Sequence, residues 1–337
     1  MTVRRREFLA LTGAGLGSSL VLAACGKLGG DKPRKGPLIG MLQMVDAPPP
    51  NQTREGFEKA LAEAGYKDGS TVTYIQKDAA GELPNTTLVM QQFLSEKVDM
   101  VLAVGTPPLQ AAMKVMPATV PVVFCYCSNP WGAGAGTPPG GVGQHKPNVV
   151  GTIGTNPVGK ELDLAREVNP ALKTAGLIYN PGEPNSEYEA KILQEEAAKR
   201  GITIVSQSVA NSGEVLQAAQ SLAEKKVEAF VKIGDYATIQ AFNSICKVGL
   251  ENKIPVYSVD ADDINLPGCL ATIGWAYFDD GYAAGQLAVR VLKGTSPATM
   301  PFEPLTKTDL LVSQATAKAI GVTLPEDLLK RAQKVVS

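Results

Sequence analysis

The sequence contains one histidine in 337 residues. That residue, His145, stands in a loop rich in glycine and proline. A metal site would therefore find almost no histidine ligands, and a nucleophilic serine would have no well-placed histidine as its general base. The Gly-x-Ser-x-Gly pattern of serine hydrolases is also missing. We therefore expect no enzyme, no metal site and no cofactor.

Long basic runs are missing once the first 24 residues are set aside. Those residues contain three arginines and one glutamate, so 29 basic and 32 acidic side chains remain, a formal charge of −3. This balance argues against nucleic acid as a partner, because few cations are grouped to neutralise phosphates.

No apolar run reaches the ~20 residues that a membrane-spanning helix needs. The chain instead begins with Arg4, Arg5 and Arg6, a short glycine-containing apolar segment, and Leu22-Ala23-Ala24-Cys25. A cationic start, a short apolar segment and a small-residue cleavage site are the parts of an export signal. We expect residues 1–24 to be a signal peptide and 25–36 a polar tether, so that the protein works outside the cytoplasm.

Two short patterns refine this expectation. The spacing of Arg5, Arg6, Phe8 and Leu9 resembles a twin-arginine signal. The four residues that end at Cys25 resemble the lipobox at which bacterial lipoproteins are cut and acylated. The resemblance implies a membrane anchor in the form of a lipid on Cys25.

The other four cysteines do not fix a disulfide. Cys125 and Cys127 are two apart in a predicted strand, so they share a face, which is an awkward geometry for pairing. Cys246 and Cys269 either bridge a helix to a strand or are two small buried apolar residues. The sequence leaves both possibilities open.

From Pro37 onward, short apolar runs alternate with helical patterns, such as those over Thr53–Ala64 and Tyr188–Arg200. Unbroken apolar strands separated by helices predict an α/β fold with doubly wound parallel sheets. The predicted strands are Leu38–Met44, Thr71–Gln76, Met100–Val104, Val120–Tyr126, Ala175–Tyr179, Thr203–Ser208, Ala229–Ile233, Pro255–Ser258 and Leu270–Gly274.

Nine strands fit two cores better than one. We expect one lobe to contain residues 37–152 plus about 276–302, and the other 153–275 plus about 303–337. Lobes joined by more than one crossing segment form a hinge, with a cleft at the carboxyl ends of the strands.

Small polar turns and aromatics follow several predicted strands and point to that cleft. The turns at Thr106 and at Asn185-Ser186 open helices whose N–H groups can receive a carboxylate. Asp235 ends another strand and offers an anion for an ammonium group. Residues of these types also cap helices and fill cores in α/β proteins that bind nothing there. The functional signal is their joint location: four aromatics also lie near strand ends, namely Tyr126, Trp131, Tyr236 and Trp275.

From residue 38 to its end, the chain resembles the bacterial extracytoplasmic substrate-binding lipoproteins of ABC importers. Relatives of that family include tryptophan and tyrosine binders, and the resemblance implies the two-lobed type I periplasmic binding protein fold. The matching stretches are Ile39–Gln43, Arg54–Phe57, Val104–Pro107, Pro121–Phe124, Tyr179–Gly182 with Asn185-Ser186, Ile254–Val256, Leu270–Gly274 and Gly321–Pro325.

The resemblance implies ligand contacts at Thr106, Asn185, Ser186 and Asp235. The chain departs from the family at residues 128–131, where Ser-Asn-Pro-Trp stands in place of an Asp-Pro pair, and at Tyr236, where asparagine is usual. The predicted ligand-binding residues are therefore Thr106, Ser128, Asn129, Trp131, Asn185, Ser186, Asp235, Tyr236 and Trp275.

These observations predict a monomeric, lipid-anchored receptor that captures a small molecule between its lobes and delivers it to an ABC permease. An aromatic or other amino acid, or a related carboxylate, is the expected ligand. Two alternatives stay open: a ligand sensor of the same fold that signals to a membrane receptor, and an exported enzyme. A DNA-binding repressor of this fold is disfavoured, because its helix-turn-helix would fall on the export signal.

Overall fold

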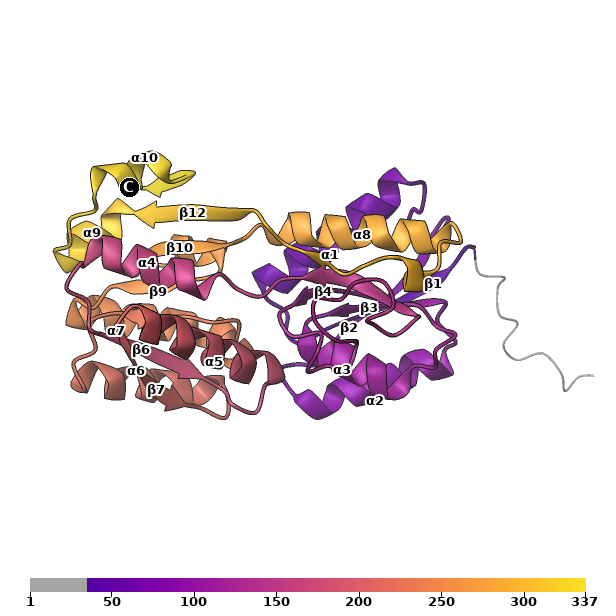
Figure 1. Ribbon diagram of the computed structural model, residues 1–337, viewed down its shortest axis with the longest axis horizontal. Helices are drawn as coiled ribbons and strands as arrows, with labels where there is room; N and C mark the ends of the chain where they lie inside the picture. Colours follow the sequence, from indigo (N-terminus) through magenta and orange to yellow (C-terminus); the bar gives the residue numbers. More distant parts are fainter. Residues whose placement is uncertain (1–34) are drawn as a thin grey trace, which may run out of the picture. The chain divides into compact units, whose positions relative to one another are not determined.

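The computed structural model describes residues 35–337. The predicted signal peptide (1–24), Cys25 and most of the predicted tether (25–36) therefore lie outside the described residues. The described part forms two sheets, of six and seven strands, each covered by helices (Figure 1). None of its helices combines the length and the apolar character that crossing a bilayer requires.

The six-stranded sheet is entirely parallel, with strand order β11-β5-β4-β3-β1-β2. All side chains of β1 and β3 are buried, as expected for strands that helices cover on both faces. The strands are β1 (Leu38–Gln43), β2 (Thr73–Asp78), β3 (Met100–Val104), β4 (Val122–Cys127), β5 (Val149–Ile153) and β11 (Glu303–Pro304).

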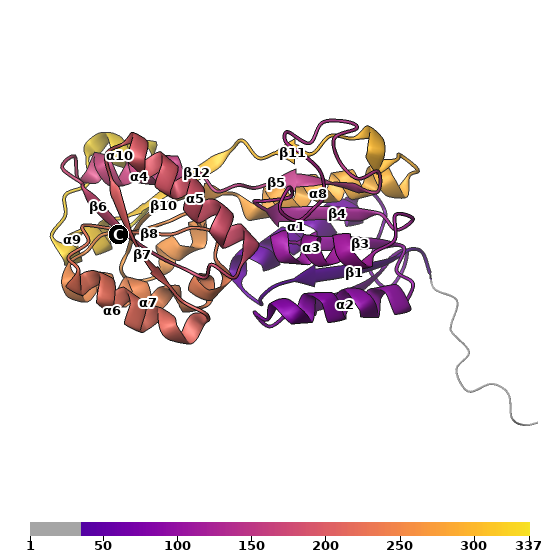
Figure 2. The same cartoon turned by 60° about the horizontal axis from the view of Figure 1, so that its bottom comes forward.

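Two helix pairs cover this sheet (Figure 2). One face carries α2 (Leu83–Ser95) and α3 (Thr106–Val115). The other carries α1 (Pro48–Glu63) and α8 (Tyr277–Leu292), which arrives from far along the sequence. Glycines let these two helices meet backbone to backbone: a Cβ on Gly281 would lie 1.6 Å from the carbonyl oxygen of Thr53. The sheet and its four helices are called lobe 1 below.

The seven-stranded sheet has the order β13-β12-β10-β9-β8-β6-β7. Helices α4 (Val158–Val168) and α5 (Pro184–Lys199) cover one face, and α6 (Val215–Glu224) and α7 (Tyr236–Asn252) cover the other. With α9 (Gln314–Ile320) and α10 (Glu326–Arg331), this sheet forms lobe 2. Its strands are β6 (Thr174–Tyr179), β7 (Thr203–Ser208), β8 (Phe230–Val231), β9 (Val256–Ser258), β10 (Cys269–Trp275), β12 (Thr308–Ser313) and β13 (Lys334–Val336).

The predicted α/β class is confirmed, and each of the nine predicted strands corresponds to an observed one within a few residues. Four strands were not predicted: β5, β11, β12 and β13. One of these unpredicted strands, β12, runs antiparallel to β10, whereas the other strand pairs of both sheets are parallel. The short β11 and β13 lack apolar side chains in a strand pattern, so pairing with a neighbour, rather than local sequence, makes them strands.

The chain passes between the two sheets three times. It leaves lobe 1 after β5, returns between β10 and α8, and leaves again between β11 and β12. Because β11 pairs with β5, the last passage follows Pro304. We keep the proposed division into two hinged lobes and place its last boundary there.

Candidate functional site

A small cavity, with about 20 Å³ open to a water-sized sphere, is lined by residues of both lobes at the carboxyl ends of their parallel strands. Larger hollows, of about 280 and 450 Å³, are lined by lobe 1 alone, and one of about 160 Å³ is lined by both lobes around Glu82, Asn180 and Gln240. Only a cavity with walls from both lobes can open and close as they move. The residues that line the small cavity, called the interlobe cavity below, are Tyr126, Ser128, Gly154, Asn156, Asn185, Glu189, Gly234, Tyr236, Ile239 and Tyr277.

Three tyrosines form the aromatic wall of the cavity: Tyr126, Tyr236 and Tyr277. The ring centroid of Tyr126 lies 5.0 Å from that of Tyr277 and 6.4 Å from that of Tyr236. Tyr126 has a left-handed backbone, with φ of +52°, at a break in the β4–β5 register. This conformation costs a non-glycine residue roughly 1–2 kcal/mol. The backbone N–H of Tyr126 donates to the buried Asp280 at 2.8 Å, which holds the strained residue in place.

Helix α5 carries a buried carboxylate to the opposite side of the cavity. Glu189 is 1% exposed and accepts hydrogen bonds from the Gly234 N–H at 2.7 Å and from Asn156 Nδ2 at 3.0 Å. Burial raises the pKa of Glu189 to about 7, although these hydrogen bonds act to lower it. Among residues 35–337, no lysine, arginine or histidine forms an ion pair with this carboxylate.

Three buried polar atoms at the cavity make no hydrogen bond of normal geometry: Asn156 Oδ1, Asn185 Oδ1 and Ser128 Oγ. Ser128 does lie near enough to Glu189 to help lower the pKa of that carboxyl. A buried polar group without a partner costs about 1–3 kcal/mol. A guest that bonds to these atoms would recover that energy.

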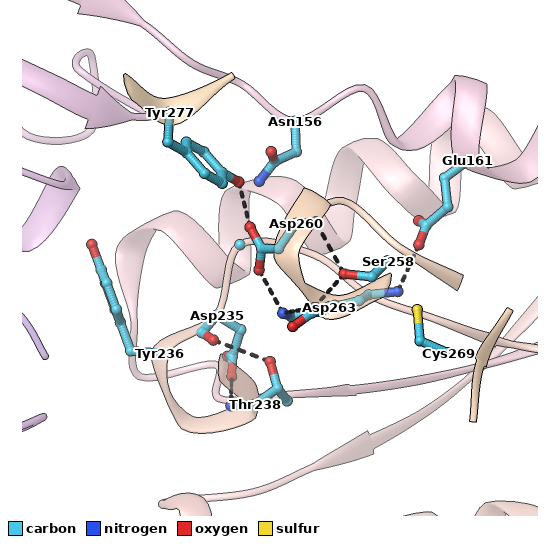
Figure 3. A network of polar contacts seen from close by, with 12 residues as sticks. Asn156, Glu161, Asp235, Tyr236, Thr238, Ser258, Asp260, Asp263, Cys269 and Tyr277 are labelled. Carbon is cyan, nitrogen blue, oxygen red and sulfur yellow. Dashed lines mark hydrogen bonds and ion pairs between the residues drawn. The ribbon is translucent and has the colours of Figure 1, made fainter. Parts of the chain in front are cut away.

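Ser186 and Asp235 lie beneath the cavity rather than in its lining. Asp235 caps α7 by accepting from the Thr238 N–H at 2.7 Å, and it also accepts from the Asn180 N–H at 2.7 Å and from the Ser186 hydroxyl. Figure 3 shows Asp235 turned toward Thr238. Ser186 and Asp235 therefore hold in place the loops that follow β6 and β8. Their predicted contact with a ligand stays a prediction.

Four other predicted residues also lie outside the lining: Thr106, Asn129, Trp131 and Trp275. The hydroxyl of Thr106 accepts a hydrogen bond from the Asn129 N–H at 3.3 Å. Trp131 stacks on Phe302 with the ring centroids 5.8 Å apart. Trp275 donates through Nε1 to the Thr155 carbonyl at 3.1 Å. Of the nine predicted residues, the cavity brings together Ser128, Asn185 and Tyr236.

Sequence reasoning missed Glu189, Asn156 and Tyr277. A signal for Glu189 existed: it follows Asn185 by four positions on a predicted helix, so the two share a face. Tyr277 follows the predicted Trp275 by two positions, in the first turn of α8. Asn156 precedes α4 in an irregular segment, where no pattern reveals the direction of a side chain.

A buried ionic network of lobe 2 is bonded to Tyr277, a cavity residue from α8 of lobe 1 (Figure 3). Tyr277, at the start of α8, donates its hydroxyl to Asp260, and Asp260 lies 2.5 Å from Lys232 Nζ. Lys232 also contacts Asp263 at 2.6 Å. Burial acts to lower the pKa of Lys232, but the two carboxylates outweigh it, so the pKa is raised and the lysine stays charged. A further contact between the lobes is the hydrogen bond from Gln52 to Asp262.

The described cysteines are all buried free thiols, which for Cys246 and Cys269 is the second of the two possibilities left open by the sequence. Burial raises the pKa of Cys246 to about 12. Residues 35–337 contain no group of three or more His, Cys, Asp or Glu side chains placed to hold a metal ion.

Comparisons with known proteins agree on the kind of protein. The family described as ABC transporter substrate binding protein matches residues 38–336. The tyrosine-binding protein of Clostridioides difficile (strain R20291) is 30% identical over 332 residues, which are 95% of this chain and 94% of that relative. A solved domain from Streptococcus pneumonia in complex with L-Trp is 26% identical, with a TM-score of 0.83 over 89% of this chain and 100% of that one.

A third comparison bears on the spacing of the lobes. The ligand-free, open structure of a substrate-binding protein with adhesive properties from Clostridium difficile is 32% identical and covers 89% of this chain and 99% of that one. Its TM-score is only 0.67, against 0.83 for the complex with L-Trp, whose sequence is less similar. The present structure therefore resembles the ligand-bound relative more than the open one.

Proposed function

Since the chain belongs to the ABC transporter substrate-binding protein family, we propose that it is a monomeric, lipid-anchored receptor outside the cytoplasm that binds an amino acid between its lobes and passes it to an ABC permease. The observation that carries the binding role is the interlobe cavity, with the unpartnered buried amide oxygens of Asn156 and Asn185. The names of the tyrosine-binding and L-Trp-bound relatives support an amino acid as the ligand.

The mechanism follows from walls that belong to different lobes. Tyr126 and Ser128 come from lobe 1, whereas Asn185, Glu189 and Tyr236 come from lobe 2. A ligand that contacts both sets gains its full binding energy only when the lobes are closed, so it shifts the population toward the closed form. The permease can then distinguish loaded from empty receptor by shape.

The closed lobes leave little space for a ligand. About 20 Å³ is open to a water-sized sphere, far below the ~300–1,000 Å³ typical of small-molecule sites, so the lobes must move apart to admit a ligand. The side chain of Tyr236 takes part of the space, since its hydroxyl oxygen would lie 2.0 Å from a Cβ on Gly105 of lobe 1. This narrow space favours a single small metabolite over a peptide as the ligand.

Thermal unfolding of the protein with each of the common amino acids tests the binding role. A true ligand raises Tm in proportion to the logarithm of its concentration over Kd. Asn185→Ala should abolish the ligand-induced rise, and Asn252→Ala, at an exposed asparagine on α7, should leave it intact. A panel in which no compound raises Tm, or an unchanged rise in Asn185→Ala, would contradict the proposed binding.

The anchor requires a separate test, because Cys25 lies outside the described residues. Cys25→Ser should release the protein from the membrane fraction of cells while ligand binding persists. Unchanged partitioning with membranes would contradict the lipid anchor and leave the binding role standing.

A further inference from the structure

We propose that the interlobe cavity is a seat for a primary ammonium group, whose three N–H donors bond to Glu189, Asn156 and Asn185. The inference rests on the proposed function and specifies which part of the ligand makes that function selective. It assigns the ammonium to residues other than Asp235, the partner predicted from sequence.

The first support is an excess of hydrogen-bond acceptors. Asn156 directs its Nδ2 to the Glu189 carboxylate at 3.0 Å, and Asn185 directs its Nδ2 to the Gly234 carbonyl at 2.7 Å. Both amide donors are occupied, which fixes the orientation of each side chain. The two Oδ1 atoms face no donor and are buried in residues only 9% and 6% exposed. A guest must bring N–H or O–H donors to satisfy them.

The second support is uncompensated negative charge. Glu189 is the acidic residue of the lining, and no lysine, arginine or histidine lines the cavity. Lys232, the buried lysine of lobe 2, is already neutralised by Asp260 and Asp263. A buried carboxylate is stabilised most by an opposite charge, so a cationic guest has the advantage over a neutral or anionic one.

The third support is the aromatic wall of Tyr126, Tyr236 and Tyr277, which lines the same space. Aromatic faces attract a desolvated cation, by ~2 kcal/mol or more in the best cases. An ammonium provides three donors to match three acceptors and a positive charge that suits the rings. A carboxylate would find no cation in the lining and would face the charge of Glu189.

Asp235 is a poor alternative, because it is fully buried and does not line the cavity. Its oxygens accept from the Asn180 N–H, the Thr238 N–H and the Ser186 hydroxyl, which hold it beneath the cavity. We therefore expect the ligand's ammonium to be essential for binding, and its carboxylate to contribute less.

The test uses isothermal titration calorimetry of the purified protein with four compounds. The parent is the amino acid that gives the largest thermal shift. The others are its decarboxylated amine, its deaminated acid and its N-trimethylated form. Wild type is compared with Glu189→Gln and with Glu187→Gln, an exposed acid on the same helix. Wild-type titrations stand on their own should Glu189→Gln fold poorly.

The expected result is that wild type binds the parent and its decarboxylated amine, and that removal or trimethylation of the amine abolishes measurable binding. Glu189→Gln should weaken binding of the parent by about 10- to 100-fold, as for the loss of a charged hydrogen bond, and Glu187→Gln should not change it. Equal binding of the deaminated acid, or unchanged affinity in a folded Glu189→Gln, would overturn the ammonium seat while the receptor function stands. If no amino acid or amine binds, the proposed function itself fails.

Discussion

Raising the pH from 5 to 8 should destabilise the ligand-free protein, and Glu189 should account for a measurable share of the loss. Burial raises the pKa of Glu189 from its ordinary value of 4.5 to about 7. Between these values the folded protein binds a proton that the unfolded chain has released, so the free energy of unfolding falls as the pH rises. Above about pH 8 the carboxyl is ionised in both states and its contribution becomes constant.

The magnitude follows from linkage. A proton that the folded protein retains and the unfolded chain has lost is worth ~1.4 kcal/mol per pH unit. Because Glu189 is half ionised at pH 7, the interval from pH 5 to pH 7 costs about 2 kcal/mol through this residue. That is a large part of the ~5–15 kcal/mol by which domains are stable. Asp280, whose pKa burial raises to about 6, acts in the same direction at lower pH. Glu183, with a pKa raised to about 8 by burial and by Asp235, extends the loss to higher pH.

Urea unfolding at pH 5, 6, 7 and 8 measures the effect, and Glu189→Gln isolates it. The variant cannot ionise, so the contributions of Asp280 and Glu183 cancel in the comparison. The difference in unfolding free energy between variant and wild type should change by about 2–3 kcal/mol in favour of the variant from pH 5 to pH 8. Parallel pH profiles for the two proteins would refute the reasoning. Excess amine ligand should reverse the wild-type trend, because a bound cation favours the ionised carboxylate.

Three further substitutions probe the contacts between and behind the lobes. Lys232→Met should cost about 3–5 kcal/mol in urea unfolding, because it leaves buried acids unpaired; a loss below 1 kcal/mol would contradict a buried ionic network. Gln52→Ala removes the bond to Asp262 between the lobes, so ligand affinity should fall several-fold while the Tm of the free protein changes little; an unchanged Kd would count against that bond. Gly105→Ala places a Cβ 2.0 Å from the hydroxyl oxygen of Tyr236, so binding should be lost and partly restored by adding Tyr236→Phe; no restoration would mean that backbone strain alone is responsible.

The alternation of buried apolar runs with helical patterns was sufficient to predict the α/β fold. It worked for strands such as β3, whose side chains are all buried and whose sequence is therefore wholly apolar. It failed for β11 and β13, which are short and largely exposed and owe their conformation to a neighbouring strand. Pairing between distant segments leaves no periodic trace in either partner.

The candidate site was predictable in location but only partly in its residues. Strand ends and helix starts led to Ser128, Asn185 and Tyr236, which line the cavity. The same logic led to Asp235, which caps its own helix and turns inward. Local sequence indicates that a polar residue ends a strand, but the packing of the second lobe decides whether its side chain faces a guest. Glu189 lines a cavity only because residues of lobe 1, such as Tyr126 and Ser128, form the other wall. Those residues lie about 60 positions earlier in the sequence, so no local pattern marks Glu189 as a site residue.

The return of α8 to α1 determines the order in which the protein can be completed. One face of the lobe 1 sheet lacks α8, the second of its two covering helices, until residue 292 has been synthesised. By then most of lobe 2 already exists. A nascent chain that stops before Tyr277 would expose the apolar side of α1 and of the strands beneath it, including Phe57 and Leu61. Truncation from the C-terminus first removes the last strands and helices of lobe 2, and a cut before Tyr277 also uncovers the N-terminal half of the protein. A chaperone that shields α1 during synthesis would protect that half until α8 arrives.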